Sequence, residues 1–287
     1  MSAAASVEGV SPTTIEAETA RYLRTGDSSE WLSVWSGDDL FARARCADAV
    51  LREVLIREVT RLAPAAVTPR TFAGVNPQSF MREKVEPLVR GLFPEGEQEV
   101  LLEVLAKSVV FLTPDTITEV LRTTTWRSTA WTLANLYLLS VGAEALSDEA
   151  PHIVGFSEGA TCFVSMNYFE TDEPLADFVV HEAAHVFHNC KREAIGLPIT
   201  RRREWLLEIA FGKRETFAYA CEAYSRLLEL GESRSSRQAL QDAHVADFKP
   251  PDERVERDEY FAILSAAVSA RNGWKAILKA CASGNAP

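Results

Sequence analysis

The chain has 287 residues, of which 47% are hydrophobic and 25% are charged, and these proportions exclude a mostly disordered protein and a collagen-like repeat. Its 41 acidic residues outnumber its 30 basic residues, and the net charge of −11 argues against a general binder of nucleic acid or of an anionic membrane. The five cysteines form no CxxC pair, so we expect reduced thiols and a cytoplasmic protein.

The first half of the chain has the pattern of consecutive helices. Residues 1–13 are rich in Ala, Ser and Thr, and we expect a disordered tail there. Apolar residues at helical spacing predict helices over about 40–62, 77–92, 96–112, 115–122 and 124–141. Asp38 or Asp39 is the predicted N-cap of the first of these helices, because its side-chain oxygen can accept from a first-turn N–H. We therefore predict a helical scaffold or substrate-selecting region over 14–122 and a second domain over 123–287.

The pattern changes near Pro151, where short strands are predicted. Residues 152–156 are a β-prone run, residues 157–160 carry a turn signal, and residues 161–168 alternate between two faces. A two-stranded hairpin with one buried face follows from this pattern. The predicted fold class is therefore α+β and predominantly helical, with a helical N-terminal half and a small hairpin or sheet in the second half.

Further helices are predicted after the hairpin. Asp172 is the expected N-cap of a helix that runs to about Asn189. A second helix is predicted over 213–230, and the polar stretch 232–251, which ends in two prolines, is predicted to be a connection. A last helical segment is predicted over 252–283.

Residues 181–185 read His-Glu-Ala-Ala-His, and three of the five histidines of the chain lie close together in this region. Positions four apart lie on one face of a helix, so His181 and His185 can bind one metal ion. Glu182 lies beside them and can take a proton from metal-bound water, which is the chemistry of HExxH zinc hydrolases. The surrounding residues are apolar, so the helix is expected to be buried, and a hydrogen-bonded structural cluster is the alternative.

The run HEAAHVFH after a hairpin resembles the active-site helix of the zincin metallopeptidases. It departs from the metzincin pattern, because His188 and Lys191 stand where that pattern has Gly and a third His. The resemblance therefore implies a third ligand from a downstream helix, as in gluzincin-like enzymes. Glu215 and Glu222 are seven apart and share one helical face. Glu215 opens an E-x-F-A pattern that resembles the ligand helix of the ImmA/IrrE-type regulatory metallopeptidases.

The resemblance implies that His181, His185 and Glu215 bind Zn²⁺. Glu222 is the alternative third ligand, and both carboxylates can instead be solvated or ion-paired. Many gluzincins carry an Asp four residues after the third ligand, but this position is Tyr219 here, which can stabilise an oxyanion or pack in the core. His188 lies on the ligand face of the helix and can bind substrate, support a ligand or be structural.

Two further features concern the substrate. The resemblance implies that the strand at 161–168 borders the cleft and pairs with extended substrate, and its face with Thr161, Ser165 and Asn167 suits water. The segment 189–214 carries seven basic and three acidic residues. It can gather acidic substrates or a peptide C-terminal carboxylate, or it can be neutralised by internal salt bridges.

The leading hypothesis from the sequence is a cytoplasmic zinc metallopeptidase that acts on a peptide or protein, with Glu182 as general base. Neither nucleic acid nor a membrane is an expected partner. The rival hypothesis is a regulatory or partner-binding module with a non-catalytic zinc site, and a third is a hydrolase of non-peptide amides. A site closed by four protein ligands indicates a structural metal, whereas an open position indicates catalysis.

Overall fold

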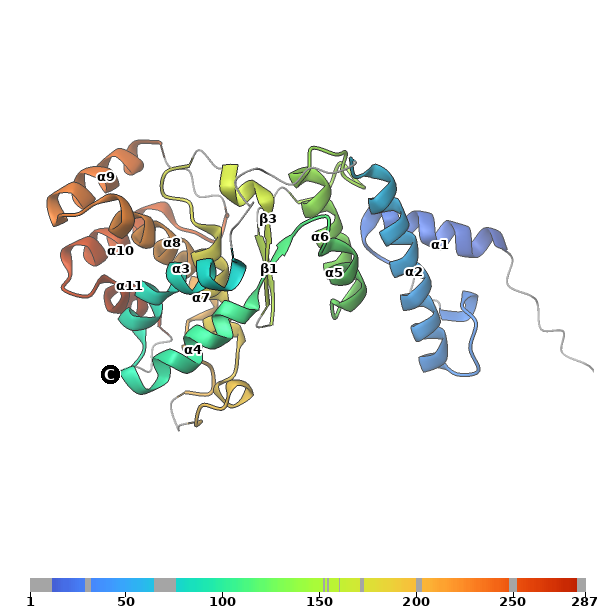
Figure 1. Ribbon diagram of the computed structural model, residues 1–287, viewed down its shortest axis with the longest axis horizontal. Helices are drawn as coiled ribbons and strands as arrows, with labels where there is room; N and C mark the ends of the chain where they lie inside the picture. Colours follow the sequence, from blue (N-terminus) through green and yellow to red (C-terminus); the bar gives the residue numbers. More distant parts are fainter. Residues whose placement is uncertain are drawn as a thin grey trace, which may run out of the picture. The chain divides into compact units, whose positions relative to one another are not determined.

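A computed structural model of the chain describes residues 12–28, 32–64, 76–151, 153, 155–159, 161–170, 173–199, 203–247 and 252–282. The described part contains the α-helices α1 to α11 and a three-stranded sheet, which confirms the predominantly helical α+β class (Figure 1). The chain divides into two compact units, residues 1–69 with 112–153 and residues 70–111 with 154–287. The boundary expected between residues 122 and 123 lies inside the first unit, within the last turn of the helix α5 (Ile117–Thr123).

The first unit contains four of the helices: α1 (Pro12–Thr25), α2 (Leu40–Leu62), α5 (Ile117–Thr123) and α6 (Arg127–Ser140). Asp39 caps α2 as predicted, and its side chain accepts from the Ala42 N–H at 2.7 Å. The buried Arg52 joins α2 to α5 by donating to the Leu121 carbonyl at 2.8 Å and to the Thr124 hydroxyl at 3.0 Å. These bonds place the two predicted helices against each other.

The second unit contains the other helices: α3 (Pro77–Leu92), α4 (Glu95–Ser108), α7 (Phe178–Asn189), α8 (Arg214–Leu230), α9 (Arg234–Asp247), α10 (Arg257–Ser269) and α11 (Gly273–Cys281). Helices α3 and α8 both pack against α7, and α10 and α11 pack against α8. Helix α7 is therefore at the centre of the hydrophobic core, as its apolar sequence predicts.

A small sheet covers another side of α7. Its strands β1 (Val109–Leu112), β2 (Gly155–Glu158) and β3 (Thr161–Ser165) lie in the order β1-β3-β2. Strands β2 and β3 are antiparallel, with Gly159 in the left-handed region (φ +62°) at the turn between them. The predicted hairpin is confirmed, although β3 is shorter than expected because residues 166–170 form a 3₁₀ turn.

Four expectations about the elements are wrong. The helix predicted over 96–112 ends at Ser108, where a β-branched and aromatic run forms β1. Helix α9 occupies most of the predicted connection 232–251. Its Gln241 side chain is buried, so the helix packs through a narrow face, which its mostly polar sequence does not indicate. The last segment is two helices, because Asn272 caps α11. The aromatic residues of the predicted helix 124–141 are expected in the core, but Trp126 is 66% exposed.

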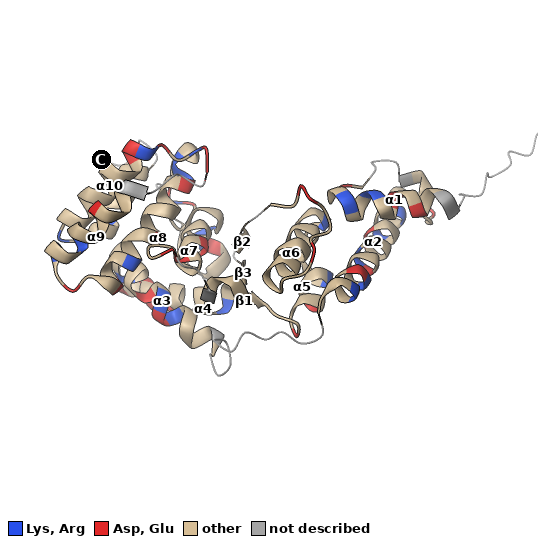
Figure 2. Ribbon diagram, turned by 90° about the horizontal axis from the view of Figure 1, so that it is seen from above, with Lys and Arg blue, Asp and Glu red and all other residues tan. Residues whose placement is uncertain are grey.

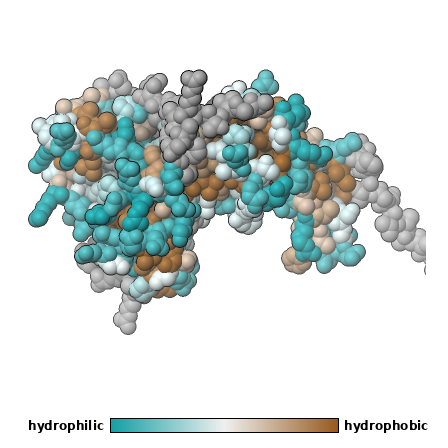
Figure 3. All heavy atoms as spheres, in the orientation of Figure 1, coloured by the Kyte–Doolittle hydropathy of each residue, from teal (hydrophilic) through white to brown (hydrophobic). Residues whose placement is uncertain are grey.

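Charged residues of both signs are interspersed along the helices (Figure 2). The face drawn in Figure 3 is mainly hydrophilic, with hydrophobic residues in scattered patches. Among the described residues, none of the helices is both long and apolar enough to cross a membrane.

Candidate metal centre

The N-terminus of α7 is fixed by Asp177. This residue is the N-cap of α7, where the sequence predicted Asp172, which lies outside the described residues. Its carboxylate accepts from the Val180 N–H at 3.3 Å and from Lys84 of α3 at 2.9 Å. Its backbone N–H donates to Glu222 of α8 at 2.7 Å. The motif on the first turns of α7 is therefore held from two neighbouring helices.

Three side-chain atoms converge beside α7. The Nε2 atoms of His181 and His185 are 3.1 Å apart, and the Glu215 Oε2 atom of α8 lies 3.9 Å and 3.6 Å from them, respectively. These distances place a common point about 2.1 Å from each atom, and zinc binds nitrogen and oxygen ligands at about 2.0–2.2 Å. The donor set therefore suits one small divalent ion.

Glu222 lies on the other side of His181. Its Oε2 atom is 3.0 Å from the His181 Nδ1 atom, and the side chain is nearly fully buried. Burial, the largest single effect, favours neutral His181, but the hydrogen bond to Glu222 and the negative charges of Glu222, Glu182 and Glu215 together raise the pKa of His181. An ionised carboxylate only accepts, so Nδ1–H of His181 donates to Glu222, and in the neutral ring the Nε2 lone pair then faces the cluster. Metal-binding histidines generally have such a carboxylate partner, and Glu222 therefore occupies a supporting position.

His188 holds His185 in the same way. Its Nε2 atom lies 3.2 Å from the His185 Nδ1 atom, and the side chain is 3% exposed. Burial, together with His185 and the positive charge of Arg214, lowers the pKa of His188 to about 3. A neutral His188 can accept the Nδ1–H of His185, which leaves the His185 Nε2 lone pair for the cluster. The structure thus favours a supporting position for His188, which the sequence left open.

Glu182 is 6% exposed, and its side chain lies beside Gly155 of β2 as well as near the two histidines. It has a hydrogen bond with Ser157 of β2. Burial raises the pKa of Glu182 although His181 and His185 oppose the change. A buried carboxylate with a raised pKa is a stronger proton acceptor than an exposed one, which suits a general base.

Gly155→Ala is expected to displace Glu182. A Cβ atom at Gly155 would lie 3.0 Å from the Glu182 Cγ atom and 3.1 Å from its Oε1 atom, too close without movement. If Glu182 is the proton acceptor of a zinc hydrolase, turnover is expected to fall about tenfold while zinc content stays unchanged, because misplacing a proton acceptor costs rate and not metal affinity. The control is Gly96→Ala, where a Cβ atom meets nothing within 4 Å. Equal turnover of the two variants would contradict this placement of Glu182.

Tyr219 and Arg254 complete the surroundings. The Tyr219 ring packs edge-on against the His181 ring, with centroids 4.4 Å apart, and burial raises the pKa of Tyr219 so that its hydroxyl keeps its proton. Arg254 forms an ion pair with Glu215, with its Nη2 atom 3.1 Å from the Glu215 Oε1 atom, and also pairs with Asp252. Burial would raise the pKa of Glu215, but the two histidines and Arg254 lower it. No motif in the sequence marks Arg254.

The strand next to the cluster is β2. The sequence assigned this position to 161–168, but β3 is the central strand and its Ser165 is fully buried. The expectation of a wet polar face on β3 is therefore wrong, since alternation does not show which strand of a hairpin lies at the edge. Among the described strands, β2 pairs with β3 alone and packs against α7 at Glu182.

Three of the seven basic residues in the segment 189–214 form internal ion pairs in the part of the chain that the structure describes. Lys191 pairs with Glu204 at 2.7 Å, Arg192 with Glu97 at 2.6 Å, and Lys213 with Glu259. Arg192 is 1% exposed and also donates to the Pro198 carbonyl at 2.8 Å. Internal pairing, one of the two alternatives, thus accounts for these three cations.

Arg192→Lys is expected to lower the free energy of unfolding by about 2 kcal/mol, because lysine cannot reproduce the forked contact with Glu97 and the bond to Pro198. Thermal or urea denaturation measures this change. The matched control is Arg203→Lys, since Arg203 is exposed in the same segment. An Arg192→Lys variant as stable as this control would contradict the assigned contacts.

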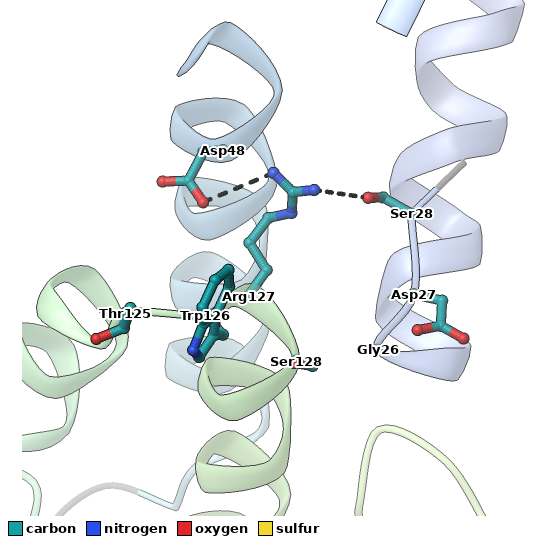
Figure 4. A pocket seen from close by; sticks show the side chains of 8 residues that line it. All are labelled: Gly26, Asp27, Ser28, Asp48, Thr125, Trp126, Arg127 and Ser128. Atoms are coloured by element: carbon teal, nitrogen blue, oxygen red, sulfur yellow. Dashed lines mark hydrogen bonds and ion pairs between the residues drawn. The ribbon is translucent and has the colours of Figure 1, made fainter. Parts of the chain in front are cut away.

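A cavity of about 370 Å³ lies in the first unit (Figure 4). Arg127 extends into it, donating to the Ser28 hydroxyl at 2.9 Å and lying 3.7 Å from the Asp48 carboxylate. The cavity is lined by residues that include no histidine or cysteine, namely Gly26, Asp27, Ser28, Asp48, Thr125, Trp126, Arg127 and Ser128. The chemistry of the donor atoms, rather than the size of a cavity, therefore identifies the cluster on α7 and α8 as the candidate site.

Within the described ranges, His181, His185 and Glu215 are the group of His, Cys, Asp or Glu residues whose ligand atoms lie close enough to hold a metal ion. The sequence named all three, and their role as ligands stays a prediction. Comparison of the chain with models of protein families, with curated proteins and with solved structures finds no match.

Proposed function

We propose that the protein is a zinc-dependent metallopeptidase in which His181, His185 and Glu215 hold one Zn²⁺ ion. The convergence of their three ligand atoms within 3.1–3.9 Å carries this proposal. The engagement of both Nδ1 atoms by Glu222 and His188 supports it, because each imidazole then offers Nε2 to the ion.

The number of protein ligands favours catalysis over a structural zinc site. A structural site usually has four protein ligands, whereas a catalytic site has three and an open position. His188 contacts the far nitrogen of His185, and the Cys190 thiol donates to the Lys191 carbonyl at 3.6 Å. Among the described residues, neither side chain joins the cluster, so three ligands remain.

Zinc held by these residues would polarise a carbonyl group and lower the pKa of its water to about 7. Glu182 accepts the proton of the attacking water and passes it to the leaving amine. Tyr219, protonated beside His181, can donate to the developing oxyanion. The edge strand β2 can pair with the backbone of an extended peptide, and this recognition favours a peptide over a small amide. The five free thiols suit the reducing cytoplasm proposed as its location.

The test is hydrolysis of a mixed peptide library by the purified full chain, with zinc measured by elemental analysis. We expect about one zinc per chain, loss of hydrolysis with phenanthroline and recovery on adding zinc. His185→Ala should lose both zinc and hydrolysis. A metal-free wild type, or hydrolysis that survives removal of the metal, would contradict the proposal, and zinc retention without hydrolysis would favour the regulatory module instead.

A further inference from the structure

Arg214 differs from three other cations of the basic segment that the structure describes. Lys191, Arg192 and Lys213 each have a carboxylate partner. Within the described part of the chain, Arg214 has no ion pair, and its Nε atom is buried without a hydrogen-bond partner. Its positive charge therefore has no carboxylate partner among the described residues.

The position of Arg214 connects it to the metal centre. It is the first residue of α8 and directly precedes Glu215, the proposed ligand. Its charge acts on His188, which contacts His185. The positive end of the α8 dipole lies at the same point, and its N-cap, Lys213, provides no side-chain hydrogen bond. A negative group of the substrate would therefore be stabilised on this side of the centre.

His188 adds a second donor without an acceptor. If His185 donates its Nδ1–H to the His188 Nε2 atom, the proton of neutral His188 resides on Nδ1. This Nδ1 atom is buried and has no partner among the described residues. Buried donors are normally paired, so two unmatched donors in neighbouring side chains indicate a shortage of acceptors here.

Phe211 supplies an apolar surface beside Arg214. The ring is 84% exposed, and the Arg214 guanidinium carbon lies 5.4 Å from its centroid. Stacking on an aromatic ring holds a guanidinium in place without consuming its hydrogen-bonding capacity. Arg214 is thus oriented and still able to form a forked bond with a carboxylate.

We propose that Arg214 binds a carboxylate of the substrate beside the metal centre, which makes acidic peptides the preferred substrate class. The preference for acidic substrates rests on the proposed function, because a carboxylate site selects a substrate only if the protein hydrolyses peptides. The carboxylate belongs either to an Asp or Glu side chain or to a peptide C-terminus, and the shared chemistry is a planar anion that accepts two N–H bonds.

The test measures binding, so that it does not depend on turnover. The full-length Glu182→Gln protein, loaded with zinc, is titrated with four matched peptides: one with an internal Glu, its Gln counterpart, one with a free C-terminal acid and its C-terminal amide. We expect the acidic member of at least one pair to bind about tenfold more tightly, and the affected pair identifies the source of the carboxylate. Adding Arg214→Ala should remove the difference, Arg214→Lys should keep part of it, and Arg203→Ala should leave it unchanged.

Equal dissociation constants within both pairs would overturn the inference, and so would a preference that survives Arg214→Ala. Circular dichroism and zinc content of each variant show that the fold and the centre are intact. Preferential binding of acidic peptides that wild-type protein does not hydrolyse would uphold Arg214 as a carboxylate site and contradict the proposed hydrolysis. Failure of the Arg214 inference can therefore be distinguished from failure of the proposed peptidase function.

Discussion

Glu182→Gln is expected to lower peptide hydrolysis by about 10²–10⁴-fold, the usual contribution of a general base, while the protein keeps about one zinc per chain. The glutamine has nearly the same shape and can retain the contact with Ser157, but it cannot accept a proton from water. Steady-state kinetics on a peptide substrate and elemental analysis of the same sample give the two quantities.

The control for this variant is Glu193→Gln, which changes an exposed carboxylate just after α7. It should leave both hydrolysis and zinc content unchanged. Full hydrolysis by Glu182→Gln would show that this carboxylate is not the base. Loss of zinc from Glu182→Gln would instead show that Glu182 holds the metal and would contradict the ligand assignment.

Glu222→Gln is expected to weaken zinc binding about 10–100-fold, the usual effect of removing such a supporting partner. The Gln carbonyl can still accept from the Asp177 N–H, as the Glu222 Oε1 atom does at 2.7 Å. Its NH₂ group then faces the His181 Nδ1 atom and favours the tautomer with the proton on Nε2. That tautomer has no lone pair for the metal. Competition with a chromophoric zinc chelator at fixed pH measures the dissociation constant.

Glu232→Gln is the control for this variant, since Glu232 is an exposed carboxylate shortly after the end of α8. An unchanged dissociation constant for Glu222→Gln would mean that the bond to His181 does not set its tautomer. Complete loss of zinc, with Glu215→Ala still binding, would make Glu222 the third ligand instead.

Much of the fold could be predicted because local signals agreed with tertiary packing. Asp39 before an apolar periodic run marked the start of α2, and the predicted bounds 77–92 are those of α3. The sequence missed β1 because Val109–Leu112 continues the apolar spacing of α4, and only pairing with β3 makes it a strand. Helix α9 was missed because its stability comes from contacts with α8 and α10 rather than from its own composition.

The centre of the site was predictable because one helix holds most of it. The spacing of His181 and His185 fixes their common face, and the E-x-F-A pattern pointed to Glu215. The sequence left a third-ligand, solvated or ion-paired role open for Glu222, because nothing local shows which nitrogen of His181 it meets. The pairing of Arg254 with Glu215 and the edge position of β2 depend on tertiary arrangement alone.

The central claim is that His181, His185 and Glu215 hold one zinc ion and leave one position open. A crystal structure with anomalous diffraction recorded on both sides of the zinc absorption edge tests it most directly. We expect one peak at about 2.0–2.2 Å from the Nε2 atoms of both histidines and from a Glu215 carboxylate oxygen, with water or substrate as the remaining ligand. No peak at this point, or an ion closed by a fourth protein side chain, would contradict it.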